Sequence, residues 1–250
     1  IAMNETDLIL KNKFDVEFVL IEPSHPGNIG ACARAVKNMG FNKLGLVNPV
    51  NFPADEAFYR AKGASDLLDN AIIYSSLNEA LAEKTLVLGT SARERTIPWP
   101  NTFTNKIFEE VSGLDGNNKI SVLFGREKSG LTNEELQRCH MHLKIPSSEE
   151  YSSLNLSHAV QIISYELRNA LLTDIDVPIK EDIPLSTDEE DEFLLKHIDE
   201  VLLGLDFYNQ NSSRQVQARI KRLLKKARPD KLEVGILRGF LSKIEEMLNK

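Results

Sequence analysis

Three separate segments of the chain combine turn residues with polar side chains that could hold a ligand, at residues 22–34, 125–130 and 145–155. The first has a Gly/Pro turn and ends on Arg34, the second contains an Arg-Glu pair between glycines, and the third runs from Ile-Pro to Ser-Ser-Leu-Asn. Each follows an apolar run that predicts a β-strand. Ligands of open α/β sheets bind just beyond the carboxyl ends of strands, so these segments predict a ligand crevice.

Better-known chemical motifs are incomplete in this sequence. Residues 125–132 stand where a P-loop would, but the Lys-Ser/Thr pair after the second glycine is missing. No G-x-G-x-x-G follows the first predicted strand, and no G-x-S-x-G elbow is present, which argues against dinucleotide-binding and hydrolase sites. Cys139, His140 and His142 are clustered, but a structural zinc site needs four ligands. We therefore expect a helix-to-strand junction there and no metal.

The elements that must position these segments follow from the hydrophobic pattern. Runs rich in Val, Ile and Leu alternate with helical patterns over the first two thirds of the chain, which predicts βα units around a parallel sheet. Residues 76–79 and 132–135 have the pattern of capping boxes. A helix over 155–172, apolar on several sides, is expected in the core and against a partner subunit. The expected strands are Asp15–Ile21, 43–47, 71–74, 85–89, 120–124 and 142–145.

The last third of the chain has a purely helical pattern. Residues 174–191 contain two prolines and many acids without periodicity, which is typical of a linker. Beyond it, apolar residues recur at helical spacing in three stretches, of which the second is expected to begin at Ser212 or Ser213 and the third after Pro229. We predict an α/β domain over 14–173 and a small all-α domain over 192–250.

Composition is that of an ordinary globular chain of 250 residues, with a net charge of -7 and 42% hydrophobic residues. The balance argues against indiscriminate nucleic-acid binding, but residues 214–231 carry a local net charge of +7. Only two cysteines are present, and no apolar stretch or signal-peptide pattern stands out, so we expect a cytoplasmic protein without a membrane partner.

In their order and spacing, the three polar segments resemble the three motifs of the SpoU-type branch of the SPOUT methyltransferases. This resemblance implies a parallel-sheet domain with a deep C-terminal trefoil knot, the cofactor S-adenosylmethionine and a homodimer. The run 89–96, followed by Pro98, Trp99 and Pro100, and the tail residues 227–229 and 236–239 resemble a subgroup that methylates ribose 2′-hydroxyls in tRNA. The target implied is the pyrimidine nucleotide at tRNA position 32.

The resemblance also implies roles for particular residues. Arg34 is expected to act on the 2′-hydroxyl; because a guanidinium is a poor general base, we expect it chiefly to orient the phosphate and stabilise the developing alkoxide. Four polar residues are expected to orient the reactants, namely Asn28, Glu127, Ser153 and Asn155. Cofactor contacts are expected from Thr90, Ser91, Ala92, Gly125, Ile145, Ser152, Ser153 and Leu154.

RNA is expected to meet two groups of side chains. Arg93 and Arg95 could contact phosphates, and Tyr151 could stack on a base. The helical domain is expected to add the cations Arg219, Arg222, Lys225 and Lys226, unless they form only a solvated helix face. The resemblance implies tRNA as the partner, and DNA is not expected as a partner. Two alternatives remain open, a non-catalytic RNA-binding protein on the same fold and a ribosomal-RNA 2′-O-methyltransferase.

Overall fold

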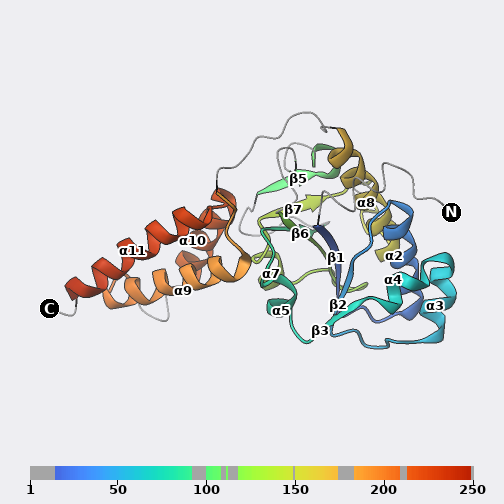
Figure 1. Ribbon diagram of the computed structural model, residues 1–250, viewed down its shortest axis with the longest axis horizontal. Helices are drawn as coiled ribbons and strands as arrows, with labels where there is room; N and C mark the ends of the chain where they lie inside the picture. The colour runs from blue at the N-terminus through green and yellow to red at the C-terminus, as the bar shows by residue number, and fades with distance from the viewer. Residues whose placement is uncertain are drawn as a thin grey trace.

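The computed structural model of the chain describes residues 15–91, 100–107, 111, 118–148, 150–173, 183–208 and 213–248. These residues form an α/β domain and a helical domain that lie side by side (Figure 1). Among the described residues, no helix has the length and apolar character needed to cross a membrane.

A sheet of seven parallel strands forms the centre of the α/β domain, in the order β3-β2-β1-β6-β4-β7-β5. Six of the strands confirm the sequence prediction to within two residues, and β5 was not predicted. All the strand pairings of the sheet are parallel, as βα units require. The strands are β1 (Asp15–Ile21), β2 (Leu44–Val47), β3 (Ile72–Tyr74), β4 (Leu86–Thr90), β5 (Asn101–Phe103), β6 (Lys119–Phe124) and β7 (Met141–Lys144).

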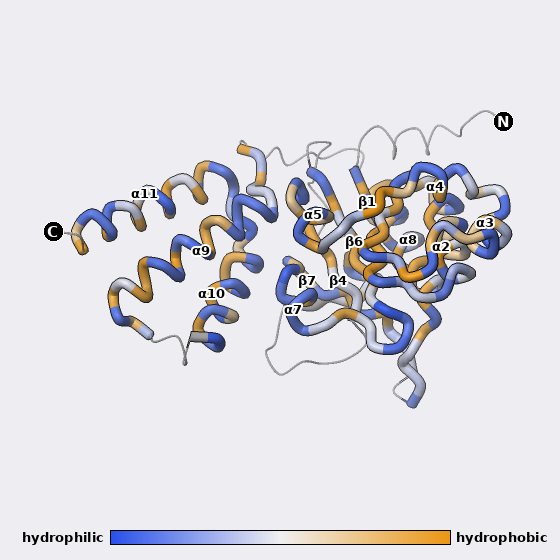
Figure 2. Tube along the Cα trace, turned by 90° about the horizontal axis from the view of Figure 1, so that it is seen from below, coloured by the Kyte–Doolittle hydropathy of each residue, from blue (hydrophilic) through white to orange (hydrophobic). Residues whose placement is uncertain are grey.

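Helices cover both faces of the sheet, and alternate residues of each strand supply two cores. On one face Phe18 and Leu20 of β1 belong to the larger core, while Val19 and Ile21 belong to the smaller core on the other face. Hydrophobic residues are dense along β1, β6 and α2 in Figure 2. The helices of this domain are α2 (Pro26–Asn38), α3 (Asp55–Ala61), α4 (Ser65–Asp69), α5 (Leu77–Leu81), α7 (Asn133–Leu136) and α8 (Leu156–Thr173), with short 3₁₀ turns η1 (Lys62–Ala64) and η2 (Thr104–Lys106).

The strand order brings distant segments to one edge of the sheet. Strands β6, β4 and β7 are neighbours, so the residues that follow their carboxyl ends, near positions 90, 125 and 145, lie together. Helix α2, which follows β1, packs on the same face as α8 and closely against α3. Gly30 allows that last approach, because a Cβ atom at this position would overlap the carbonyl group of Ala57.

Helix starts follow the capping signals of the sequence with one difference. Thr132 and Glu135 form the complete capping box that was predicted. At the other site Ser76 accepts from the Glu79 amide, but the Glu79 carboxylate bonds to Ser75, so only half of the box forms. In α8 one face is buried in the core, whereas Tyr165 on another side is 52% exposed.

The helical domain consists of α9 (Asp188–Gly204), α10 (Ser213–Ala227) and α11 (Lys231–Leu248), which pack around Leu194, Leu224 and Val234. The predicted linker is too long at its C-terminal end, because α9 begins at Asp188 with a capping box between Thr187 and Glu190. The helical domain thus starts four residues before the predicted residue 192. The expected trefoil knot stays a prediction from the family resemblance.

Candidate functional site

A cavity of about 230 Å³ opens at the carboxyl ends of β4, β6 and β7. Two of the three polar segments identified in the sequence line it, together with the end of β4. Seven of the eight expected cofactor residues belong to this lining, and the eighth, Ala92, lies outside the described residues. The seven are Thr90, Ser91, Gly125, Ile145, Ser152, Ser153 and Leu154.

The loop from Gly125 to Gly130 forms one wall of the cavity and folds back on itself. The amide of Arg126 donates to the Gly130 carbonyl (3.2 Å), and the Gly130 amide donates to the Arg126 carbonyl (2.8 Å). A Cβ atom at Gly125 would overlap the backbone of Gly130, which itself has a positive φ of 68°. Glycine is therefore needed at position 125 to close the loop.

Arg126 fixes this loop to two neighbouring elements, a role that the sequence analysis missed. Its Nε donates to Glu22 Oε2 (2.8 Å), after the end of β1, and its two terminal nitrogens donate to Glu135 of α7 (3.0 Å each). The hydrogen bond from Arg126 lowers the pKa of Glu22. Both carboxylates raise the pKa of the guanidinium. Because all three of its guanidinium nitrogens donate to these carboxylates, Arg126 holds the loop from Gly125 to Gly130 against the end of β1 and against α7. We call this contact the loop clamp.

Glu127 joins the second polar segment to the first. Its carboxylate accepts from the Ser24 amide (3.2 Å) and hydroxyl (3.0 Å), the His25 amide (3.2 Å) and the side-chain amide of Asn28 (3.2 Å). Burial by itself raises the pKa of Glu127, but these hydrogen bonds outweigh burial, so the pKa lies below its ordinary value. The carboxylate is thus charged at neutral pH and acts as an acceptor.

Asn155 joins the third polar segment to the first. Its Nδ2 donates to Asn28 Oδ1 (3.2 Å), and its Oδ1 accepts from the amide (2.9 Å) and hydroxyl (2.8 Å) of Ser157. Asn155 therefore caps the start of α8. The chain Glu127–Asn28–Asn155 brings the three segments into one hydrogen-bonded unit beside the cavity.

Two of the expected functional residues lie at the surface. Arg34 is exposed and is not part of the cavity lining. It stands six residues after Asn28 on α2, which is about 9 Å along the helix axis and about 120° around it. Tyr151 is 80% exposed next to the lining residue Ser152, so its ring is free to stack. Arg93 and Arg95 lie outside the described residues.

The clustered residues Cys139, His140 and His142 are buried, as is Cys32. Cys32 and Cys139 are fully buried, and burial raises the pKa of each thiol far above neutrality. His140 Nδ1 accepts from the Val87 amide (3.0 Å), and His142 Nε2 lies 2.9 Å from the Leu136 carbonyl. Within the described part of the chain, no group of three or more such ligands could hold a metal ion.

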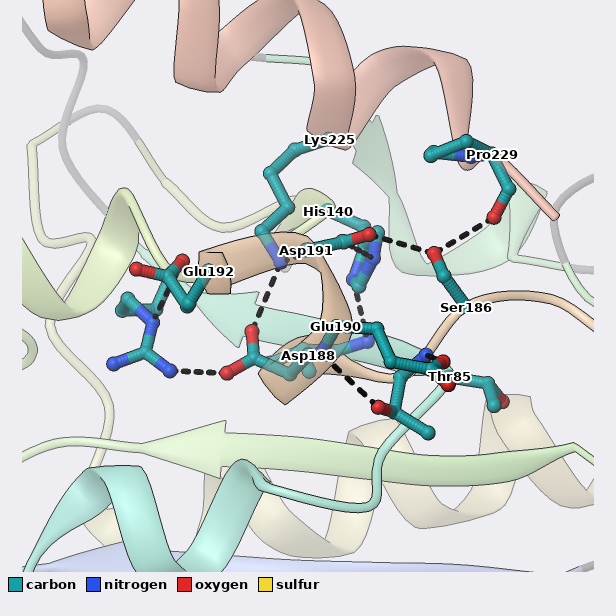
Figure 3. A network of polar contacts seen from close by, with 12 residues as sticks. Thr85, His140, Ser186, Asp188, Glu190, Asp191, Glu192, Lys225 and Pro229 are labelled. Carbon is teal, nitrogen blue, oxygen red and sulfur yellow. Dashed lines mark hydrogen bonds and ion pairs between the residues drawn. The ribbon is translucent and has the colours of Figure 1, made fainter. Parts of the chain in front are cut away.

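The basic residues of α10 divide into two sets. Arg219 and Lys226 are exposed and Arg222 is partly exposed, so their charges can reach an RNA backbone. Lys225 has an exposed fraction of 0%. Its ammonium group lies beside Asp188 and Asp191 (Figure 3) and forms ion pairs with both. The prediction that Lys225 contacts RNA is therefore wrong, because two buried carboxylates already hold its ammonium group.

Comparisons with known proteins agree with this arrangement. Residues 15–165 match the model of the SpoU rRNA Methylase family, and residues 189–250 match that of the C-terminal domain of tRNA methyltransferase TrmJ. The tRNA (cytidine/uridine-2′-O-)-methyltransferase TrmJ of Cronobacter sakazakii is 43% identical over 240 residues, covering 94% of this chain and 98% of the relative.

Two solved structures extend the comparison to the fold. The crystal structure of TrmJ from Z. mobilis ZM4 superposes with a TM-score of 0.78 at 27% identity, covering 92% of this chain and 98% of that one. The SpoU methyltransferase AviRb from Streptomyces viridochromogenes, crystallised with the cofactor AdoMet, is 20% identical with a TM-score of 0.53. It covers 69% of this chain and 67% of that chain, and this likeness concerns the fold alone.

Proposed function

Because this chain belongs to the SpoU rRNA methylase family and carries the TrmJ C-terminal domain, we propose that it methylates the ribose 2′-hydroxyl of a pyrimidine nucleotide in tRNA. The methyl donor is S-adenosylmethionine, and the target is the nucleotide at position 32 of the anticodon loop. The observation that carries the proposal is the hydrogen-bonded chain from Glu127 through Asn28 to Asn155, which assembles three distant segments beside one cavity.

The cavity lining fits an adenosyl sulfonium ligand. Ile145 and Leu154 offer apolar cover for a flat base, while Thr90, Ser91 and Ser152 offer hydroxyl or backbone groups for the ribose and amino-acid parts. When bound, the donor supplies an electrophilic methyl carbon next to a positive sulfur. The protein has to bind it, orient the sugar in line with it and exclude water.

Each polar residue has a distinct part in this reaction. Asn28 and Asn155 hold the loops at fixed positions, and the charged Glu127 keeps the first loop in place through hydrogen bonds from Ser24, His25 and Asn28. Arg34 orients the phosphate next to the target ribose and stabilises negative charge that develops on the 2′-oxygen, whose proton is released to bulk solvent. Ser153 lies in the lining, where its hydroxyl can meet the ribose.

We also propose that tRNA contacts both domains. Tyr151 stacks on an anticodon-loop base beside the cavity, and Arg93 and Arg95 contact phosphates. On the helical domain, the remaining cations Arg219, Arg222 and Lys226 follow each other at spacings of three and four, which puts them on one side of α10. This basic stripe (Arg219, Arg222 and Lys226) meets the RNA backbone.

The working form is proposed to be a cytoplasmic homodimer. Arg34 is exposed and lies outside the cavity lining of its own chain. Tyr165 of α8 also exposes its aromatic ring at the surface. We infer that Arg34 of one copy acts at the cavity of the other copy in this dimer. Mixing the variants Arg34→Ala and Leu154→Arg, the second of which fills the cavity, tests this, because a mixed dimer regains one complete site only if the arginine acts across the interface.

The function is tested by incubating the purified protein with unmodified tRNA and S-adenosylmethionine labelled in the methyl group. We expect label in tRNA, resistance of the modified linkage to alkaline hydrolysis, and a modified nucleotide at position 32. Binding of tRNA without transfer of label would favour a non-catalytic RNA-binding protein. If ribosomal RNA is offered in a parallel incubation, label there and none in tRNA would favour a ribosomal-RNA 2′-O-methyltransferase. A methyl group at another anticodon-loop ribose would correct the position and leave the reaction class unchanged.

A further inference from the structure

A group of buried charges lies between the helical domain and the α/β domain (Figure 3). Asp188 and Asp191, in the first turn of α9, are both 0% exposed. Lys225 of α10 lies 2.9 Å from Asp188 Oδ1 and 3.0 Å from Asp191 Oδ2. A single ammonium group thus bridges two carboxylates inside the helical domain.

Each aspartate has a second partner in the α/β domain. Arg138, which follows α7, forms an ion pair with Asp188 and a further one with Glu192 of α9, whose Oε1 is 3.3 Å from its Nε. His140, just before β7, has its Nε2 3.7 Å from Asp191 Oδ2. The two carboxylates are therefore shared between the domains.

The backbone of α9 is joined to the α/β domain at the same place. The amide of Asp188 donates to the Lys84 carbonyl (2.8 Å), and the amide of Glu189 donates to the Ala82 carbonyl (3.3 Å). Amides in the first turn of a helix have no partner within the helix, so the turn before β4 supplies acceptors for them. Helix α9 begins directly on the surface of the α/β domain.

Charge balance makes this contact specific. Within the helical domain, Lys225 supplies one positive charge to the two buried aspartates, and Arg138 of the other domain supplies the second. His140 adds no charge at neutral pH, because burial and the nearby Lys225 lower its pKa to about 4. Removal of one member of such a buried group leaves a charge without its partner, which is far more costly than loss of a surface pair.

The contact also has a defined relation to the cavity. His140 and Lys84 precede β7 and β4, whereas the carboxyl ends of these two parallel strands line the cavity. His140 further accepts a hydrogen bond from Val87 of β4 and so joins the two strands at this end. The helical domain is thus attached to the two strands that also build the cavity.

We propose that Lys225 is a positioning residue, which locks the helical domain onto the α/β domain through Asp188 and Asp191. This lock fixes where the basic stripe of α10 presents its charges to tRNA. The inference rests on the proposed function, since it assumes tRNA as substrate. It replaces direct RNA contact as the role of this lysine, and it assigns direct contact to its neighbour Lys226.

The two adjacent lysines provide a matched experiment in the full chain. We expect Lys225→Met to increase the radius of gyration measured by small-angle X-ray scattering and to raise KM for tRNA by about tenfold or more. Its kcat at saturating tRNA and its affinity for S-adenosylmethionine should stay within about twofold of wild type, because the cavity residues are unchanged. Lys226→Met should keep the wild-type radius and raise KM for tRNA by less than about fivefold.

Arg138→Gln is the second variant, since it leaves Lys225 with both aspartates and changes only the other side of the contact. We expect the same larger radius and higher KM for tRNA. Wild-type radius and KM in both Lys225→Met and Arg138→Gln would overturn the inference, as would equal losses of kcat and cofactor affinity in both. A wild-type protein that methylates no tRNA would refute the proposed function, while the scattering comparison would still decide whether Lys225 locks the domains.

Discussion

Asn28 and Asn155 are 127 positions apart in the chain, yet Nδ2 of Asn155 donates a hydrogen bond to the side-chain oxygen Oδ1 of Asn28 at 3.2 Å. The other half of each side chain is also in use, because Asn28 donates to Glu127 and Asn155 accepts from Ser157. The start of α8 and the first turn of α2 therefore hold a fixed relative position. Replacement of either asparagine should therefore disturb both the start of α8 beside the cavity and the first polar segment, residues 22–34.

Asn155→Asp separates the two roles of this residue. Aspartate keeps the oxygen that caps α8 but has no amide to donate to Asn28, so we expect wild-type thermal stability and a fall in kcat of about a hundredfold from misplaced groups. Asn155→Ala should lose the cap as well, at a cost of about 1 kcal/mol in the free energy of unfolding. Calorimetry and single-turnover methylation check these expectations, and an Asn155→Asp enzyme with normal kcat would contradict them.

Arg126→Lys should weaken the binding of S-adenosylmethionine. Lysine cannot form the paired hydrogen bonds to Glu135 while also reaching Glu22, so the loop from Gly125 to Gly130 loses its clamp. We expect the dissociation constant, measured by titration calorimetry, to rise about tenfold, the equivalent of one strong hydrogen bond. Arg60→Lys, the same exchange at an exposed site on α3, is the control. Equal affinities of the two variants would argue against the clamp.

Arg219→Gln should reduce both the affinity for tRNA and its dependence on salt. If Arg219 neutralises one phosphate, the slope of log K against log salt should become shallower by about one unit. The control is Lys196→Gln on α9, which removes another exposed charge of the same domain, with a side chain that is 74% exposed and paired with Glu200. A filter-binding series at several salt concentrations measures both slopes. The same decrease in both variants would show that only total charge matters.

Stability should fall as the pH is lowered from about 6.5 to about 4, because of His140. Burial lowers its pKa from 6.5 to about 4 in the folded protein, so over this range the unfolded chain takes up a proton that the folded chain does not. The expected loss is on the order of 3 kcal/mol. Asp191, with a pKa of about 2 against 3.8, adds a separate loss at lower pH. Urea unfolding of wild type and His140→Asn at several pH values tests this, since the variant should show a flatter profile between pH 6.5 and 4.

The sheet could be predicted because most of its strands are apolar runs, and because helix-capping patterns such as those at Ser76 and Thr132 mark the helices between them. β1 matches its predicted bounds, and the Thr132 capping box is present as expected. β5 escaped prediction because it has only three residues, Asn101–Phe103, and two of these are polar. The start of α9 was missed although Thr187 and Glu190 have the same capping pattern as Thr132 and Glu135.

The cavity residues could be predicted from the sequence only because they follow predicted strands and match the motifs of the family. The partners that hold them were not, since nothing local links Arg126 to Glu22 or Asn155 to Asn28. Lys225 shows the same limit more sharply. In the sequence it looks like its exposed neighbour Lys226, and only the aspartates contributed by another helix reveal that it is buried.

Helix α9 is attached to the α/β domain just before β4 and β7, whereas the cavity lies at the carboxyl ends of these strands. An RNA that contacts both the helical domain and the cavity must therefore have a minimum length. Within one chain the attachment of α9 and the cavity are separated by about the length of β4, whose five residues span about 16 Å. A trinucleotide can reach the ribose site beside the cavity but leaves the helical domain untouched, whereas a folded stem and loop is long enough to contact both. The length and shape of the RNA can thus contribute to the choice of substrate, in addition to contacts with the target nucleotide.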